Sequence, residues 1–114
     1  MANPSHFAPT ASGRLLSALH QSGQMSRAQA TIAAGLARSA AGTAADELIK
    51  LGLIQASPAT ESKGTRGRPS LELSIRPDGA AVIAVQLHRD KVDLAVVDLG
   101  RNFLHRETHD LDVV

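Results

Sequence analysis

The fold is decided by residues 26–54, SRAQATIAAGLARSAAGTAADELIKLGLI. Ser26, with Gln29 three positions later, matches the capping-box pattern, so a helix is predicted to begin at Ser26. Gly35 then supplies the residue for a tight turn. A second helix is predicted over residues 38–51, because small apolar side chains recur there at steps of three and four. Two short helices joined by a tight turn are typical of helix–turn–helix proteins, whose second helix enters the major groove of DNA.

Another helix is predicted upstream of this pair. Ser12 is its expected N-cap, the leucines of residues 15–19 form its apolar face, and Gly23 ends it, so the helix should cover residues 12–21. Residues 1–11 read as a disordered lead-in, and a secretory signal is not expected there, because a charged region followed by an apolar one is lacking.

A β-hairpin is predicted downstream of the helix pair. Leu53 and Ile54 start a strand, residues 55–62 are rich in Ser, Thr, Ala and Pro and read as a loop, and residues 71–75 alternate apolar and polar side chains. This alternation indicates a half-buried strand that pairs back onto residues 53–55. Three helices followed by such a hairpin predict a winged helix–turn–helix.

The tip of this hairpin, residues 63–69, is the expected wing. Its Arg-Gly-Arg-Pro core resembles an AT-hook, an extended segment that places arginines in a narrow minor groove. We therefore expect Arg66 and Arg68 to lie in the minor groove and Lys63 to contact a phosphate. The alternative is a flexible hairpin with solvated charges.

A three-stranded antiparallel β meander is predicted after a turn at residues 77–79. Residues 81–87, 92–98 and 103–111 are rich in strand-forming side chains and are separated by polar turns. A lone meander of this length buries little surface, so it should pack on another element or begin a larger sheet. The expected fold class is α+β.

The charge of the chain is unevenly distributed. The net charge of +1 combines residues 1–76, which carry eight Lys or Arg and four Asp or Glu, with residues 77–114, which carry four and seven. Only the first part has a positive field suited to a polyanion. This asymmetry predicts two modules, a DNA-binding domain at residues 12–76 and the β meander at residues 77–114.

The composition excludes several classes of protein and site. The chain has no Cys, which excludes disulfides and thiolate metal sites and fits a cytoplasmic location. Its apolar runs fall short of the roughly 18 residues needed to cross a bilayer, so no membrane partner is expected. Aromatic residues make up only 2%, so stacking on unpaired bases is nearly unavailable and duplex DNA is the expected nucleic-acid partner.

Nine residues are candidates for DNA contact. The N-terminal half of the second helix of the pair should read the major groove, with an arginine bound to guanine or phosphate; a solvated helix face is the alternative. The start of the first helix of the pair offers free N–H groups to a phosphate, although its serine is explained as a cap alone. With the wing, the candidates are Ser26, Arg27, Arg38, Ser39, Gly42, Thr43, Lys63, Arg66 and Arg68.

No catalytic site is expected. The sequence suggests no Ser/His/Asp arrangement and no carboxylate pair placed for catalysis. His105 and His109 are four positions apart, but we find no third nearby ligand beyond Asp110, so a metal site is not expected. We therefore expect no enzyme activity, no metal and no cofactor.

Four segments, taken in order, resemble the repressor branch of the ROK family (repressors, open reading frames and sugar kinases). They are SRAQATIAAGL at residues 26–36, DELIKLGLI at 46–54, GRPSLEL at 67–73 and AVIAVQLHRDKVDLAVVDLGRNFL at 81–104. The resemblance covers nearly all residues from about residue 12 onward. It implies a sugar-responsive transcription factor, in which a winged DNA-binding domain precedes an actin-like sensor derived from a sugar kinase.

The chain departs from this family in three respects. The family's sensor is a few hundred residues long, whereas here the matching segment ends after three strands, so the chain is expected to be truncated and a sugar effector is not expected. Gln86 and His88 stand where the kinase branch carries a carboxylate and a glycine of its phosphate loop, which argues against ATP chemistry. Ala37, Ala40 and Gly42 stand where recognition helices of the family carry Ser or Thr, and a mid-helix Gly42 costs about 1 kcal/mol relative to Ala.

The expected function is a sequence-specific, duplex-DNA-binding transcriptional regulator of the repressor type, acting as a homodimer on a pseudo-palindromic site. The rival is a protein-interaction module whose helices dock a partner and whose meander pairs by its exposed edges. Charge reversal at Arg66 and Arg68 separates the two hypotheses, because it should abolish DNA binding and leave partner docking largely intact.

Overall fold

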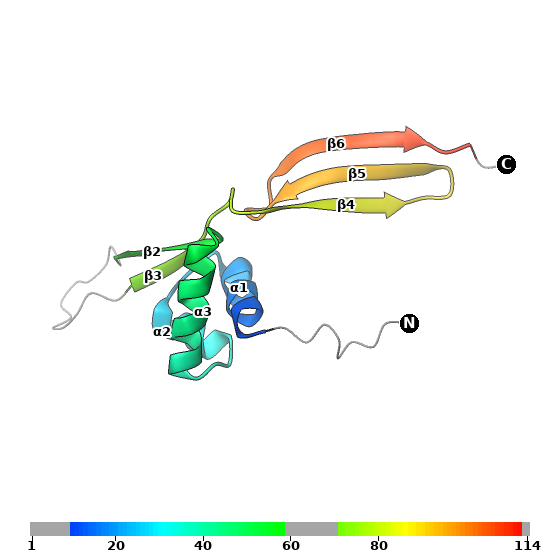
Figure 1. The fold of residues 1–114 in the computed structure, drawn as a ribbon. Coiled ribbons are helices and arrows are strands. Elements are labelled where there is room, and N and C mark those ends of the chain that lie inside the picture. Colours follow the sequence, from blue (N-terminus) through cyan, green and yellow to red (C-terminus); the bar gives the residue numbers. More distant parts are fainter. Residues whose placement is uncertain (1–9, 59–70, 113–114) are drawn as a thin grey trace.

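The computed structural model describes residues 10–58 and 71–112, which form an α+β fold of three helices and two three-stranded antiparallel sheets (Figure 1). The elements, in chain order, are α1 (Ala11–Ser22), β1 (Gln24–Ser26), α2 (Arg27–Ala33), α3 (Arg38–Lys50), β2 (Ile54–Pro58), β3 (Leu71–Ile75), β4 (Ala81–Leu87), β5 (Lys91–Asp98) and β6 (Phe103–Asp110). The expected α+β class is confirmed. Among these helices, none combines the length and apolar composition that a membrane crossing requires.

Polar side chains cap the starts of α1 and α2. The Ser26 hydroxyl accepts the N–H of Gln29, and the Gln29 side chain accepts the N–H of Ser26, both at 3.1 Å, so the predicted capping box is confirmed. The N-cap expected for α1 is wrong. Thr10, with an extended backbone, accepts the N–H of Gly13 at 3.1 Å, whereas the Ser12 hydroxyl donates to a carboxylate of α3.

Left-handed glycines follow all three helices. Gly23 has a φ of 83°, Gly35 a φ of 65° and Gly52 a φ of 76°. A residue with a Cβ adopts this conformation only at a cost, so glycine is the natural choice at each position. The helix ends and the turn predicted at these three glycines are confirmed.

The first sheet has the strand order β1-β3-β2. The predicted pairing of β2 with β3 is confirmed, but residues 55–58, expected in a loop, continue β2. These residues are exposed on an edge strand, where no buried face imposes an apolar alternation. The sequence analysis also missed β1, whose three residues pair with the other edge of β3 and are too few to show a strand pattern.

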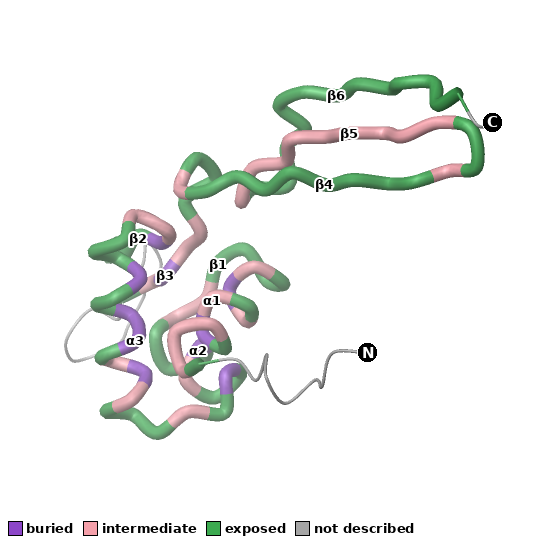
Figure 2. Tube along the Cα trace, turned by 45° about the vertical axis from the view of Figure 1, so that its right-hand side comes forward, coloured by how far each residue is buried: buried purple, intermediate pink, exposed green. Residues whose placement is uncertain are grey.

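The core lies between the helices and this first sheet. The largest fully buried side chains are Leu15, Leu19, Ile54 and Leu73. Small side chains complete the core from α2 and α3, namely Ala30, Ala34, Ala41, Ala44 and Ala45, together with Leu48. Figure 2 shows buried segments on all three helices and in the first sheet. The steps of three and four along α3 predict an inward face of Ala41, Ala44, Ala45, Leu48 and Ile49, and this face is confirmed except at Ile49, which is 40% exposed.

The second sheet is a meander with the order β4-β5-β6, as predicted, and its strands agree with the expected bounds to within one residue. It extends away from the helices (Figure 1). Strands β4 and β6 are exposed along their whole length and β5 is half-buried (Figure 2). Ile83 and Leu87 of β4 are 74% and 75% exposed, so the described residues leave an apolar strand uncovered.

Two contacts join this meander to the helical part, close to the turn predicted at residues 77–79. Gly79 has no room for a side chain, because an added Cβ would lie 2.4 Å from the carbonyl oxygen of Gly52. Arg101, in the turn between β5 and β6, has a φ of 68° and donates from its guanidinium to the carbonyl of His20 at 2.9 Å. The β5–β6 turn therefore contacts the C-terminal end of α1 directly.

Candidate nucleic-acid interface

The turn between α2 and α3 fixes how these two helices sit on the molecule. It passes through Gly35, and α3 begins at Arg38. Arg14 of α1 donates from its guanidinium to the carbonyl of Gly35 at 3.1 Å, so α1 braces the turn. The sequence analysis missed this role of Arg14, because no local pattern connects it to a residue 21 positions later.

The N-terminal half of α3 carries four of the candidate residues. Arg38, Ser39 and Thr43 are exposed, and the Thr43 hydroxyl donates to the carbonyl of Ser39 at 3.2 Å. At 100° per residue, Ser39 and Thr43 lie roughly opposite the buried alanines. Gly42 is half-buried rather than exposed, because a side chain of α2 lies beside it.

That side chain is Arg27, the first residue of α2. A Cβ built on Gly42 would lie 3.0 Å from Nη2 of Arg27, so the guanidinium rests against α3 where Gly42 has no side chain. Arg38 is four residues before Gly42 and therefore neighbours it on the same face of α3. Arg27, Gly42 and Arg38 thus share one side of the helix pair. Neither arginine forms an ion pair within residues 10–58 and 71–112.

The C-terminal half of α3 is acidic. Asp46 and Glu47 are exposed, and a Glu47 carboxylate oxygen accepts the Ser12 hydroxyl of α1. The positive charge of the described helix pair is therefore concentrated at the starts of α2 and α3, with Lys50 as a further cation at the end of α3. An anion would approach the helix pair most favourably on the side that Arg27 and Arg38 share.

The remaining candidate residues divide into two groups. Ser26 is held in the α2 capping box, which accounts for its side chain without a ligand. Lys63, Arg66 and Arg68 lie outside the described residues, so the expected wing contacts stay predictions. The helical candidates thus gather around the starts of α2 and α3.

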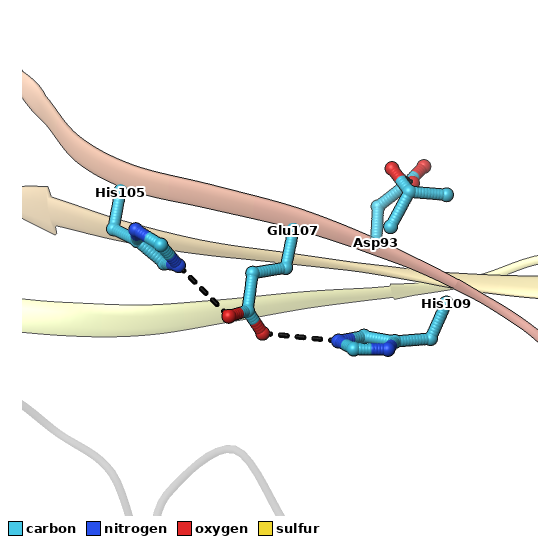
Figure 3. A network of polar contacts seen from close by, with 5 residues as sticks. Asp93, His105, Glu107 and His109 are labelled. Atoms are coloured by element: carbon cyan, nitrogen blue, oxygen red, sulfur yellow. Dashed lines mark hydrogen bonds and ion pairs between the residues drawn. The ribbon is translucent and has the colours of Figure 1, made fainter.

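A row of charged and imidazole side chains lies on β6 (Figure 3). Glu107 accepts from Nε2 of His105 at 2.9 Å and from Nε2 of His109 at 3.0 Å. The hydrogen bond from His109, then that from His105, lowers the pKa of the Glu107 carboxyl from its ordinary value. The sequence analysis paired the two histidines but overlooked Glu107 between them, because alternation along a strand puts all three on one face.

A second polar cluster lies on the opposite face of this sheet. Asp93 accepts the Thr108 hydroxyl at 2.7 Å and lies 2.7 Å from Nε2 of His88. These two hydrogen bonds, that from Thr108 first, lower the pKa of the Asp93 carboxyl. Within the part of the chain that the structure describes, no group of three His, Cys, Asp or Glu side chains is placed to hold a metal ion.

Comparison with known proteins places this geometry in context. No protein-family model matches the chain, and no curated protein matches its sequence. Among solved structures, the chain is similar to a ROK family transcriptional regulator described as a homologue of the E. coli MLC protein, with a TM-score of 0.63 and 26% sequence identity. The match covers 88% of this chain and 25% of that chain, so this chain spans about a quarter of that regulator's length. The likeness supports a ROK-like fold.

Proposed function

We propose that the chain binds duplex DNA as a transcriptional regulator through a winged helix–turn–helix at residues 12–76. In this proposal α3 enters a major groove, α2 crosses the DNA backbone, and Arg66 and Arg68 of the wing enter the adjacent minor groove. Lys63 contacts a phosphate. The β meander at residues 77–114 is a second module that takes no part in DNA contact.

One observation carries the proposal: Arg27 of α2 and Arg38 of α3 share one side of the helix pair. Arg27 lies against Gly42 of α3, and Arg38 neighbours Gly42 on the same helix face. Arg14 braces the turn between the helices from behind. The likeness to a ROK family transcriptional regulator supports the same function.

Binding to DNA at different salt concentrations tests the proposal. Each phosphate that a Lys or Arg neutralises releases condensed counterions, so the affinity for a duplex should fall steeply as the salt concentration rises from about 50 to 200 mM. Fluorescence anisotropy with a labelled duplex measures this. A flat response, or no binding at low salt, would remove the proposal.

Substitution of Arg38 gives a matched test at one residue. Arg38→Ala should weaken binding to a preferred duplex by about 5- to 150-fold if the guanidinium contacts guanine, the equivalent of about 1–3 kcal/mol. Arg89→Ala is the control, because Arg89 is an exposed arginine in the β4–β5 turn of the second sheet. Equal affinities for the two variants would contradict a role for α3 in DNA binding.

A homodimer on a pseudo-palindromic site is part of the same proposal. Helix–turn–helix dimers bind two half-sites about one helical turn apart, so the preferred duplex should contain an inverted repeat with centres roughly 10 base pairs apart or a multiple of this. Selection from a randomised duplex pool and sequencing of the bound fraction measure this spacing. A single asymmetric half-site would indicate a monomeric reader.

Protein docking through the second sheet is the competing function, and the exposure of β4 favours it. Val82, Ile83, Val85 and Leu87 are each at least 58% exposed, and β4 is an edge strand without charge or proline. Such an edge is a template for pairing with another chain. Charge reversal at Arg27 and Arg38 should abolish DNA binding and leave such docking unchanged, which distinguishes the two functions.

A further inference from the structure

The surface of α3 has few polar side chains of its own where a recognition helix needs them. Ala37, Ala40 and Gly42 supply none, and Asp46, one turn beyond Gly42, carries the charge that DNA repels. Arg38, Ser39 and Thr43 remain, and the Thr43 hydroxyl is already bonded to the helix backbone. Arg38 is therefore the one long donor side chain that the N-terminal half of α3 offers to base edges.

Arg27 of α2 brings a guanidinium to that same surface. Its Nη2 lies 3.0 Å from the position that a Cβ of residue 42 would occupy. Contact at this distance is tighter than most Cβ atoms make, so an alanine at position 42 would shift the guanidinium by a few tenths of an ångström, and a longer side chain such as leucine would take up the space it occupies. The absence of a side chain at Gly42 therefore leaves space on α3, and the guanidinium of Arg27 lies in that space.

We propose that Gly42 provides the space in which the guanidinium of Arg27 lies, and that Arg27, held there beside Arg38, reads a guanine in the major groove; this rests on the proposed DNA-binding function. Arginine is the residue best suited to this contact, because its two parallel N–H donors match the O6 and N7 acceptors of guanine. Beside Gly42 of α3, the specificity-determining residue is thus Arg27, which belongs to α2.

A glycine within a helix is otherwise hard to account for. Gly lowers helix stability relative to Ala, so replacement of Gly42 by a good helix former should raise the midpoint of unfolding. The same replacement takes away the space in which the Arg27 guanidinium lies. The proposal therefore predicts opposite changes from one substitution: greater stability and weaker, less selective DNA binding.

The experiment is a double-mutant cycle with Gly42→Leu and Arg27→Ala in the full chain. The probes are the duplex that the unmodified chain selects from a randomised pool and its single-base-pair variants. We expect Gly42→Leu to weaken binding about 10-fold or more with Arg27 present, and to have little effect in the Arg27→Ala background. Discrimination at one G·C pair should be lost in both single variants. Additive effects of the two substitutions would overturn the proposal.

The salt dependence distinguishes a base contact from a phosphate contact. Loss of a base contact leaves the slope of affinity against salt almost unchanged and relaxes selectivity at one position. Loss of a phosphate contact reduces that slope by about one unit and weakens binding to all duplexes alike. The second pattern in Arg27→Ala would overturn the assignment to guanine.

A measurement on the free protein tests the placement of Arg27 beside Gly42 separately from DNA binding. The side-chain Nε–H of Arg27 should show restricted motion in ¹⁵N relaxation for the unmodified chain and free motion in Gly42→Leu, while Arg89 is equally mobile in both. Equal mobility of Arg27 in the two proteins would disprove that placement. If the chain selects no duplex at all, the proposed function fails together with the guanine contact, and the relaxation result alone decides whether Gly42 provides the space for Arg27.

Discussion

At the scale of single residues, short-range hydrogen bonds decide where the helices begin. The two hydrogen bonds of the α2 capping box join Ser26 and Gln29, which are three positions apart. Whether this box forms therefore depends little on the rest of the fold. Thr10 and Ser12 show the opposite case. Both residue types can cap a helix, but Thr10 accepts the N–H of Gly13, whereas the Ser12 hydroxyl donates to Glu47 of α3.

Removal of the α2 cap tests this reasoning. Ser26→Ala leaves the N–H of Gln29 without its acceptor and should lower the free energy of unfolding by about 1 kcal/mol, within a range of about 0.5–2 kcal/mol. Urea denaturation measures the change. Ser17→Ala, at an exposed position within α1, is the control and should be neutral or slightly stabilising. An equal loss in both variants would show that the cap contributes nothing.

The titration of Glu107 is a second prediction at this scale. The hydrogen bonds from His109 and His105 lower the pKa of its carboxyl in the folded chain, so the ionised form stabilises the fold at pH values above the ordinary carboxyl pKa of 4.5. That contribution is lost as the pH falls through the lowered pKa. His105→Ala combined with His109→Ala should return the pKa of Glu107 toward 4.5, as measured by NMR titration. An unchanged pKa of Glu107 would contradict the prediction, and the pKa of Asp93, which rests on Thr108 and His88, serves as the control.

At the scale of elements, strong periodic patterns predicted the structure well and weak ones did not. All three helices, β3 and the strands of the meander lie where apolar spacing indicated. Strand β1 and most of β2 were missed, because their residues are few or exposed and become strands through pairing with β3. Strand β3, whose Leu73 is buried in the core, therefore holds both edge strands of the first sheet through backbone pairing.

Truncation of β3 at its centre tests this role. Leu73 is 2% exposed in the middle strand, so Leu73→Ala should lower the free energy of unfolding by about 2–5 kcal/mol through lost burial and a cavity. Such a loss is a large share of the stability of a small domain. Leu71→Ala, at a position of β3 that is 40% exposed, should cost less than about 1.5 kcal/mol. Thermal and urea denaturation compare the two variants, and similar losses would argue against a β3-centred core.

At the scale of the whole molecule, the chain is extended, 70 Å along its longest axis, with the meander reaching away from the helices (Figure 1). The helical part and the meander meet where Gly79 abuts Gly52 and where Arg101 bonds to His20. Arg101 occupies a left-handed conformation that is unfavourable for a residue with a side chain. Its guanidinium holds the C-terminal end of α1, where a cation also complements the helix dipole.

Loss of this bond should loosen the meander relative to the helices. The chain has no cysteine, so spin labels can be attached at Ser17→Cys and Asp110→Cys without other changes. Arg101→Ala should broaden the measured distribution of distances between the labels, whereas Arg89→Ala, at the far turn of the meander, should leave it unchanged. A distribution as narrow in Arg101→Ala as in the unmodified chain would show that the backbone contact at Gly79 suffices.

The sequence by itself determined the helices, the capping box of α2 and the left-handed glycines, because these depend on residues within a few positions of one another. It also indicated a positively charged N-terminal part. Only the tertiary structure decided that Arg27 lies against Gly42, that Arg14 braces the turn at Gly35 and that the meander bonds to α1. These contacts join residues 15 to 81 positions apart, and no local propensity encodes which of many possible partners a long side chain will meet once the core has packed.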